Sequence, residues 1–256
     1  MNYIGIFEGG GVKGIAHIGA LRALEERGFF CKKASGTSVG AIIASLVVAG
    51  YSSIELTNIL FNLEINKLKE RSRLLHSIRH LGIYSSNPLE EYIDLLLKDK
   101  GIETYQDLKI GNDYLLKVVA TDITKRKKII LPDDLFKYSI HPDSFKVSKS
   151  VVMSATYPFF YKPLKLNKSL IVDGGVSDNF PINIFNDNES LIIGFNLVDN
   201  IKDIKKSEDA FIIKIPTFNI KAMNFNISLD LKKKLYISGY MAGMKFLDRY
   251  FLSKWK

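Results

Sequence analysis

The sequence contains a serine in the pattern G-x-S-x-G, formed by Gly36, Thr37, Ser38, Val39 and Gly40. A serine on a sharp strand-to-helix turn exposes its hydroxyl at the edge of a sheet, and small neighbours allow both the turn and the approach of a substrate carbonyl. The pattern is short and arises by chance in chains of this length, so its surroundings have to support it. Ser38 is the candidate nucleophile, and the chemistry it indicates is acyl transfer.

A glycine-rich loop near the N-terminus supplies a candidate oxyanion hole. Acyl transfer needs donors for the developing oxyanion in addition to a nucleophile and a base. The loop follows a strand-like stretch and leads into a helix, so unhindered N–H groups at a positive helix end can point at negative charge. Its residues are Gly9, Gly10, Gly11, Val12, Lys13 and Gly14.

The same six residues also satisfy the G-x-G-x-x-G pattern of dinucleotide-binding folds. Such a fold needs an acidic residue at the end of the second strand to hold the ribose. The expected second strand, residues 30–35, contains Cys31, Lys32 and Lys33 and no acid. Lys-Ser or Lys-Thr, which would close a phosphate-binding P-loop, is also missing after the glycines. Dinucleotide binding is therefore the third of the functions considered.

The catalytic base has to be assigned although no histidine follows residue 141. Hydrolases with this serine pattern place the triad in the order serine, acid, histidine, yet the histidines here are His17, His76, His80 and His141. We expect His17 to be a packed or hydrogen-bonded residue. A partly buried carboxylate can have its pKa raised enough to act as a base. Asp173, followed by Gly174 and Gly175, is the best placed; the alternative is that it only begins a turn.

Strand-like and helical segments alternate along the chain, which predicts a three-layer α/β/α fold with a mainly parallel central sheet. Asn87 is expected to cap a helix, with Pro88 in the first helical position and Glu90 answering the cap. The expected strands cover residues 3–7, 30–35, 115–121, 128–131, 170–172, 191–198 and 211–215, and the expected helices cover residues 15–27, 38–49, a stretch from about 53, 87–98, 147–155 and about 228–255.

Bulk composition is that of one folded domain spanning residues 1–256. Hydrophobic residues make up 46% and charged residues 25% of the chain, and no stretch has the composition of a linker. The longest apolar run, residues 41–49, is far short of the roughly 18 residues that a membrane span needs. Because residue 1 leads directly into a strand-like stretch, we expect no secretory signal. Cys31 is the single cysteine and is expected to be a core residue. These features predict a cytoplasmic protein.

Positive charge is concentrated at the C-terminal end. Of the net charge of +9, a surplus of seven falls on residues 201–256, which carry 12 Lys and Arg against 5 Asp and Glu. This is either a solvated face or a surface with affinity for an anionic membrane. Nucleic acid is the weaker candidate, because no nucleic-acid-binding motif accompanies the charge. The helix expected at about 228–255 is amphipathic and ends with Trp255 among lysines, and residues 62–80 form a basic amphipathic stretch that could act as a cap.

Residues 8–14, 36–40 and 173–175, in this order and without a late histidine, resemble the patatin-like phospholipase family. That family is known for an oxyanion-binding G-G-G-x-[RK]-G loop, a serine in G-x-S-x-G, and an aspartate in D-G-G or D-G-A that forms a dyad with the serine. Further similarity lies in residues 82–97, in Ser-Ala-Thr-Tyr-Pro at 154–158 and in Asn-Phe-Pro at 179–181. The resemblance runs from residue 3 to about 200.

The resemblance implies that Ser38 attacks an ester carbonyl and that Asp173 accepts its proton and later activates water. Backbone N–H groups around Gly10, Gly11 and Val12 would bind the oxyanion. Lys13 holds the basic position of the loop, where it would hold the loop, meet a lipid phosphate or be purely structural. No metal or organic cofactor is implied, and the substrate would be a phospholipid or lysophospholipid.

Two functions of different classes follow. The leading one is a lipid acyl hydrolase of the phospholipase A or lysophospholipase type. The alternative is a lipid-surface binding or regulatory protein whose hydrolase site is gated or vestigial, and it draws on the basic C-terminal face and on residues 62–80.

Overall fold

The computed structural model describes residues 1–62, 70–71, 84–185, 190–199, 211–224 and 226–253. The basic stretch expected at 62–80, with His76 and His80, therefore lies largely outside the described residues, and so does Trp255.

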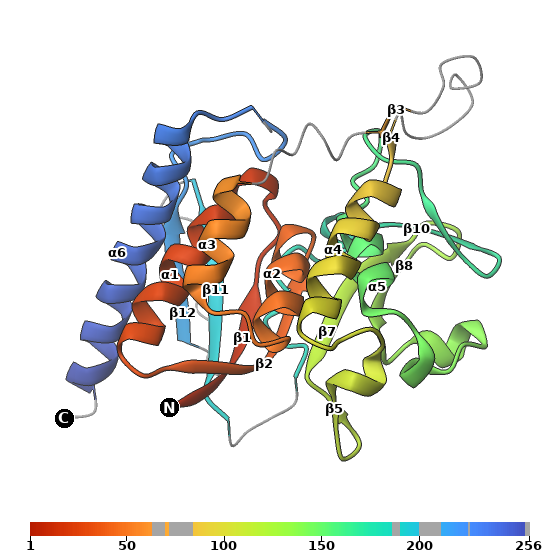
Figure 1. Cartoon of the computed structure of the whole chain (residues 1–256), viewed down its shortest axis with the longest axis horizontal. Coiled ribbons are helices and arrows are strands. Elements are labelled where there is room, and N and C mark those ends of the chain that lie inside the picture. The colour runs from red at the N-terminus through yellow and green to blue at the C-terminus, as the bar shows by residue number, and fades with distance from the viewer. Residues whose placement is uncertain (63–69, 72–83, 186–189, 200–210, 225, 254–256) are drawn as a thin grey trace.

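An eight-stranded mixed sheet forms the centre of the molecule (Figure 1). Its parallel part has the order β12 (Phe211–Pro216), β11 (Ile192–Val198), β1 (Asn2–Phe7), β2 (Phe30–Thr37) and β7 (Leu116–Asp122). Its antiparallel part has β8 (Lys127–Leu131) and β10 (Ser169–Asp173) on β7, and β9 (Leu164–Leu166) on β10. Two short ribbons lie outside it, β3 (Glu70–Arg71) with β4 (Tyr84–Ser85) and β5 (Lys109–Ile110) with β6 (Asp113–Tyr114).

The helices lie in front of the sheet in Figure 1, with α6 at the left and α4 and α5 at the right. They are α1 (Ile15–Glu26), α2 (Val39–Val48), α3 (Ser53–Asn62), α4 (Asn87–Asp99), α5 (Val147–Ala155) and α6 (Leu229–Ser253). Helix α2 is buried over most of its length, as its apolar composition predicts. No described helix combines the length and the apolar character that crossing a bilayer requires.

Side chains of β1 alternate between the two faces of the sheet. Tyr3 and Phe7 belong to the core that the helices cover, whereas Ile4 and Ile6 pack in a second cluster with Phe185. In the described part of the chain this second face is covered over β1 and β11 by residues 180–185, which form no helix. The predicted α/β class with a mainly parallel central sheet is confirmed, and the helices of the described residues pack on one face of that sheet.

One detail of the sequence prediction is wrong. Helix α4 begins at Asn87 itself, and Ser86 occupies the cap position without a side-chain capping bond. The N–H of Glu90 donates to the Ser86 carbonyl at 3.0 Å, so the first helical turn closes one residue earlier than expected. Pro88 then falls within the first two helical positions, where its missing N–H costs nothing.

Candidate active site

Two strands bring the candidate dyad together by ending at neighbouring positions on β7. Strand β2 runs parallel to β7 and ends at Thr37, which pairs with Val119. Strand β10 runs antiparallel to β7 and ends at Asp173, which pairs with Ala120. The carboxyl ends of β2 and β10 therefore lie at the same level on the two sides of β7, and Ser38 follows directly after Thr37.

Ser38 occupies a strained turn between β2 and α2. Its backbone has φ +55° and ψ −124°, a conformation that L-residues rarely adopt and that is found mainly at functional sites. Its N–H donates to the Ser154 hydroxyl at 2.8 Å, and that hydroxyl donates to the Val119 carbonyl at 2.5 Å. Gly40 lets the turn approach β1, because a Cβ there would lie 2.2 Å from the Phe7 carbonyl oxygen.

Asp173 is buried, with 3% of its surface exposed. Its Oδ1 accepts the Gly175 N–H at 2.7 Å, and its own N–H donates to the Thr156 carbonyl at 2.9 Å. The buried Oδ2 makes no formed hydrogen bond with a described residue. Burial raises the pKa of Asp173 to about 6, although the Ser38 hydroxyl and the Gly175 N–H lower it. The Ser38 hydroxyl therefore lies close enough to the carboxylate to lower its pKa.

The glycine loop between β1 and α1 lies beside this serine. A Cβ on Gly9 would be 3.3 Å from the Ser38 Cβ. The loop is held by three backbone bonds: Gly9 N–H to the Asn179 carbonyl at 3.0 Å, Val12 N–H to the Ala222 carbonyl at 3.0 Å, and Lys13 N–H to the Gly10 carbonyl at 3.1 Å. The N–H groups of Gly10 and Gly11 make no hydrogen bond with the described residues, as expected at the first turn of a helix.

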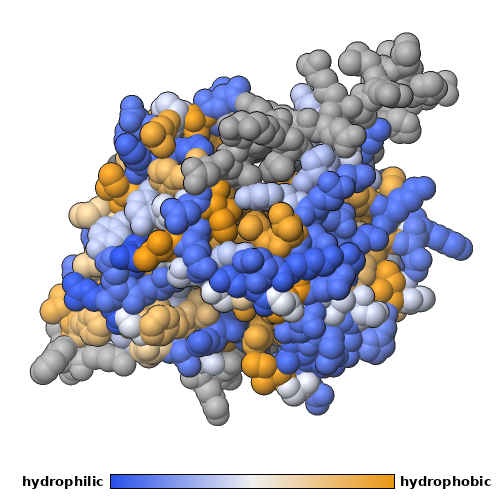
Figure 2. Space-filling model, viewed as in Figure 1, coloured by the Kyte–Doolittle hydropathy of each residue, from blue (hydrophilic) through white to orange (hydrophobic). Residues whose placement is uncertain are grey.

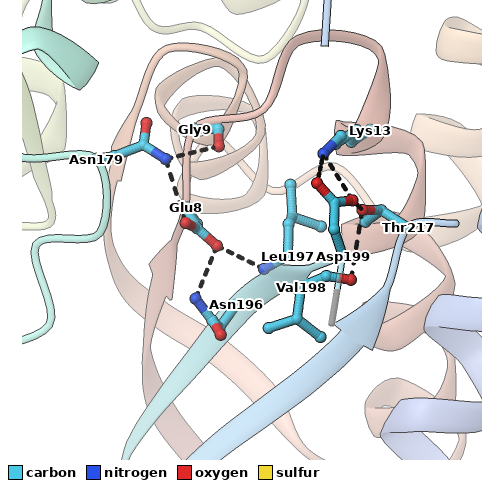
Figure 3. A network of polar contacts seen from close by, with 9 residues as sticks. All are labelled: Glu8, Gly9, Lys13, Asn179, Asn196, Leu197, Val198, Asp199 and Thr217. Carbon is cyan, nitrogen blue, oxygen red and sulfur yellow. Dashed lines mark hydrogen bonds and ion pairs between the residues drawn. The ribbon is translucent and has the colours of Figure 1, made fainter. Parts of the chain in front are cut away.

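Glu8 anchors the loop to the sheet, as Figure 3 shows. Its Oε2 accepts the Leu197 N–H at 2.5 Å and the Asn196 Nδ2 at 2.8 Å, and its Oε1 accepts the Asn179 Nδ2 at 3.2 Å. The same Asn179 Nδ2 donates to the Gly9 carbonyl at 3.1 Å. Burial raises the pKa of Glu8 to about 7 against the lowering effect of these hydrogen bonds.

Lys13 points from the loop towards the end of β11. Its Nζ binds both carboxylate oxygens of Asp199 at 2.9 and 3.0 Å, and the Thr217 hydroxyl donates to the same carboxylate (Figure 3). Only 13% of the Lys13 side chain is exposed. Of the roles considered for Lys13, these contacts favour holding the loop.

His17 is hydrogen-bonded within the core, as predicted. Its ring is buried, and burial lowers its pKa to about 4, so the ring is neutral at physiological pH. Nε2 lies 2.9 Å from the Glu8 carbonyl oxygen, which can only accept, so Nε2 carries the proton. His17 therefore supports the residue before the glycine loop and is not a base for Ser38.

A cavity of about 660 Å³ opens above these groups. Its polar part contains Ser38, Asp173 and residues 9–13 of the glycine loop, together with Val39 and Gly175. Its apolar part comes from α2, α3 and α4 and includes Ile42, Leu46, Ile59, Leu60, Leu89, Ile93 and Leu96.

The other motif residues stand behind the cavity wall. A Cβ on any of the four glycines among them would lie 2.2–2.4 Å from a neighbouring atom; these are Gly14, Gly36, Gly40 and Gly174. The Thr37 hydroxyl donates to the Asp178 carbonyl at 2.8 Å and thereby joins the end of β2 to the loop after Asp173. These residues shape the site without reaching into the cavity. The described residues include no cluster of three His, Cys, Asp or Glu side chains suited to a metal ion.

Two side chains of the site were not assigned a role from the sequence. Ser154 fixes the backbone of Ser38, and Asn179 joins the glycine loop to the segment after Asp173. Both belong to segments that carry the family resemblance, and that was the only signal available for them.

The chain is similar in sequence to known proteins. The family model described as patatin-like phospholipase matches residues 5–186. An uncharacterized protein of Bacillus subtilis, YqhO, is 38% identical over 216 residues, which cover 79% of this chain and 73% of that protein. A probable lipid hydrolase of invertebrate iridescent virus 6, 463L, is 30% identical over 191 residues, which cover 70% of this chain and 61% of the viral protein.

The fold has solved counterparts. The crystal structure of VipD from Legionella pneumophila superposes with a TM-score of 0.73 at 16% identity, covering 96% of this chain and 67% of VipD. The family model covers well over half of this chain, and the sequence relatives extend across most of it. The chain belongs to the patatin-like phospholipase family.

Proposed function

We propose that this protein is a lipid acyl hydrolase that cleaves carboxylic esters of phospholipids or lysophospholipids with Ser38 as nucleophile and Asp173 as base. The observation that carries the proposal is that β2 and β10 end at the same level on either side of β7, which brings Ser38 and the buried Asp173 to one cavity beside the glycine loop. Membership of the family and the similarity to a probable lipid hydrolase support lipid esters as the substrate class.

In the first half-reaction the Ser38 Oγ attacks the ester carbonyl carbon and its proton passes to Asp173. The free Oδ2 is the oxygen available for this transfer, because Oδ1 already accepts the Gly175 N–H. The N–H groups of Gly10 and Gly11 are the donors left for the oxyanion, since that of Val12 is bonded to Ala222. Collapse of the tetrahedral intermediate breaks the ester C–O bond, and the proton on Asp173 goes to the leaving alcohol.

In the second half-reaction Asp173 takes a proton from water, and the hydroxide attacks the acyl-Ser38 carbonyl. The same donors hold the second oxyanion, and collapse returns the proton to the Ser38 oxygen with release of the fatty acid. A base with a pKa of about 6 is ionised at neutral pH and still basic enough for both transfers.

The apolar part of the cavity suits the acyl chain of the substrate. Ser38, Ile42 and Leu46 follow one another at four-residue intervals at the start of α2 and along it, so the cavity wall continues from the nucleophile for two helical turns, about 12 Å. Residues of α4 line the cavity at similar spacing with Leu89, Ile93 and Leu96. A slot of this kind binds hydrocarbon by removing it from water.

A fluorophosphonate probe followed by mass mapping tests the proposal directly. We expect the label on Ser38, with labelling abolished in Ser38→Ala and strongly slowed in Asp173→Asn. Ser177→Ala is the matched control, because this hydroxyl lies near Asp173 and bonds the Thr121 hydroxyl at 2.8 Å, yet has no role in the reaction. Label on another serine, or undiminished labelling in Asp173→Asn, would contradict the assignment. An unlabelled protein that binds lipid would favour the alternative of a gated or vestigial site.

A further inference from the structure

Helix α6 carries a stripe of exposed side chains that neither the core nor the catalytic cavity uses. Every fourth residue along it is exposed, in the order Lys233, Ile237, Met241, Lys245 and Arg249. Ile237 is 58% and Met241 61% exposed. The stripe runs from Lys233 to Arg249, seventeen residues or about 24 Å of helix, with two apolar side chains in the middle and cations at both ends.

The opposite face of α6 is fixed against α1, which determines where the stripe points. A Cβ on Gly239 would lie 1.8 Å from the Ala16 carbonyl oxygen, and one on Gly19 would lie 1.9 Å from that of Tyr236. Leu235 and Leu247 are buried on this inner face. The two backbones are therefore in direct contact, and α6 cannot rotate to bury Ile237 or Met241.

A groove of about 810 Å³ runs along the stripe, between α6 and the edge strand β12. The five residues of the stripe line it, and so does Phe218, which is 43% exposed and lies under the Lys234 ammonium at 4.2 Å from the ring centroid. Lys and Arg outnumber acids in its wall by five to one, the acid being Asp230. In Figure 2 apolar and hydrophilic side chains lie next to one another along the left margin, over α6.

Three cations of the stripe have no carboxylate partner in the described part of the chain. Among the described residues, no ion pair joins a carboxylate to Lys233, Lys245 or Arg249. Long basic side chains beside exposed apolar ones are the arrangement by which a helix binds the interface of an anionic bilayer, since their stems bury while their charges reach the head groups.

The groove is next to the catalytic cavity. Lys232 lines the cavity and its neighbour Lys233 lines the groove. The segment before α6 is shared in the same way, with Phe218 in the groove and Ala222 and Met223 in the cavity. A lipid surface bound along the stripe thus lies beside the site at which lipid would be cleaved.

We propose that the stripe of α6 and its groove form a docking surface for a membrane that contains anionic phospholipid. The proposal rests on the proposed function only in that both take lipid as the ligand. Docking is a binding property and does not require hydrolysis. All binding measurements therefore use the Ser38→Ala background, in which vesicles stay intact.

Flotation with vesicles of phosphatidylcholine, with and without phosphatidylserine, provides the test. We expect recovery with the anionic vesicles to be much higher and to fall with added salt. Lys245→Gln combined with Arg249→Gln should weaken partitioning roughly 30-fold, since each basic residue near an anionic surface contributes about a factor of five. Ile237→Ser with Met241→Ser should weaken binding by removing the apolar contact.

Lys165→Gln with Lys168→Gln is the matched control. It removes the same charge at exposed positions in and next to β9, the strand at the opposite end of the sheet from β12, and should leave binding unchanged. Equal recovery from neutral and anionic vesicles would overturn the proposal, and so would equal losses in the stripe and control variants. A stripe variant that changed the oligomeric state in light scattering would identify a second copy of the chain as the occupant and would overturn it as well.

Discussion

Asn179 binds Gly9 through two hydrogen bonds of opposite direction. Its backbone carbonyl accepts the Gly9 N–H at 3.0 Å, and its side-chain Nδ2 donates to the Gly9 carbonyl at 3.1 Å. Asn179 follows the turn that contains Asp173, so this pair of hydrogen bonds ties the segment of the proposed base to the loop of the proposed oxyanion donors. The relative position of these two segments thus depends on contacts between residues 170 apart in the chain.

Asn179→Ala should lower kcat roughly 25-fold and leave KM nearly unchanged. The variant loses the bonds from Nδ2 to Gly9 and Glu8, each worth about a factor of five, while the acyl slot is untouched. Steady-state hydrolysis of a water-soluble ester measures both constants. Asn179→Asp keeps the shape of the side chain but replaces the Nδ2 donor with an oxygen, which would face two other acceptors, the Gly9 carbonyl and the Glu8 carboxylate. It should therefore lower kcat at least as much. An increase in KM alone would contradict a positioning role.

Asp173→Asn should be far less active and yet more stable than the wild type at neutral pH. Loss of the base reduces hydrolysis by roughly 10²–10⁴-fold. The pKa of Asp173 is raised from 3.8 to about 6 by burial, so the native state binds more protons than the unfolded state between these values. Wild-type stability therefore falls as the pH rises through this window, and the variant avoids this loss, on the order of 2–3 kcal/mol above pH 6.

Urea unfolding of both proteins from pH 4 to pH 7 measures this effect. The stability difference should be small at about pH 4 and should grow until about pH 6, where Asp173 becomes ionised in the folded protein. A pH-independent difference would show that Asp173 does not titrate in this range.

The rate of the reaction should rise with pH through about 6. Asp173 accepts a proton from Ser38 only when it is ionised, so kcat/KM should fall about tenfold for each pH unit below its pKa. A pH series with a soluble ester measures this limb, and circular dichroism at each pH separates it from acid unfolding. A second inflection near pH 7 would report Glu8, which holds the glycine loop. A flat profile between pH 5 and pH 8 would exclude Asp173 as the base.

Gly11→Ala and Gly111→Ala form a matched pair that isolates the contact at the glycine loop. Both glycines have positive φ, +54° and +60°, so both variants lose about 1 kcal/mol from the strained backbone. At Gly11 the new Cβ would also lie 2.1 Å from the Ala222 carbonyl oxygen, whereas at Gly111 nothing lies within 4 Å. Urea unfolding should therefore show Gly11→Ala to be destabilised by at least about 1–2 kcal/mol more. Equal losses of stability in the two variants would mean that the Ala222 carbonyl moves away at little energetic cost.

The sequence was sufficient for the parts of the site that are local in the chain. Ser38 and the glycine loop are defined by their immediate neighbours, because the turn and the helix start need small residues at fixed spacings. Ser154 and Asn179 could not be assigned in this way. Their partners lie 116 and 170 residues away, and only the folded sheet brings them together.

The same distinction holds for the fold. The buried strands and α2 were predicted from continuous apolar runs, whose burial needs no knowledge of the partner. The three-residue strand β9 has too few residues for a pattern, and residues 180–185 cover the second face of the sheet without helical periodicity. The start of α4 was misplaced by one residue because Asn87 and Ser86 are both good caps, and the backbone bond from Glu90 decides between them.

Ile42→Trp should shorten the acyl chains that the enzyme accepts. Ile42 lies one helical turn beyond Ser38 in the cavity wall, and the indole ring would close the slot at that point. Esters from acetyl to palmitoyl form the test series: short chains should retain near wild-type kcat/KM, and long chains should lose at least tenfold, as expected when a methylene no longer fits its pocket. Ile54→Trp is the control, because Ile54 lies on α3 outside the cavity and is 54% exposed. A loss of equal size at every chain length would place the acyl chain elsewhere, since a general defect in folding or catalysis lowers all rates together.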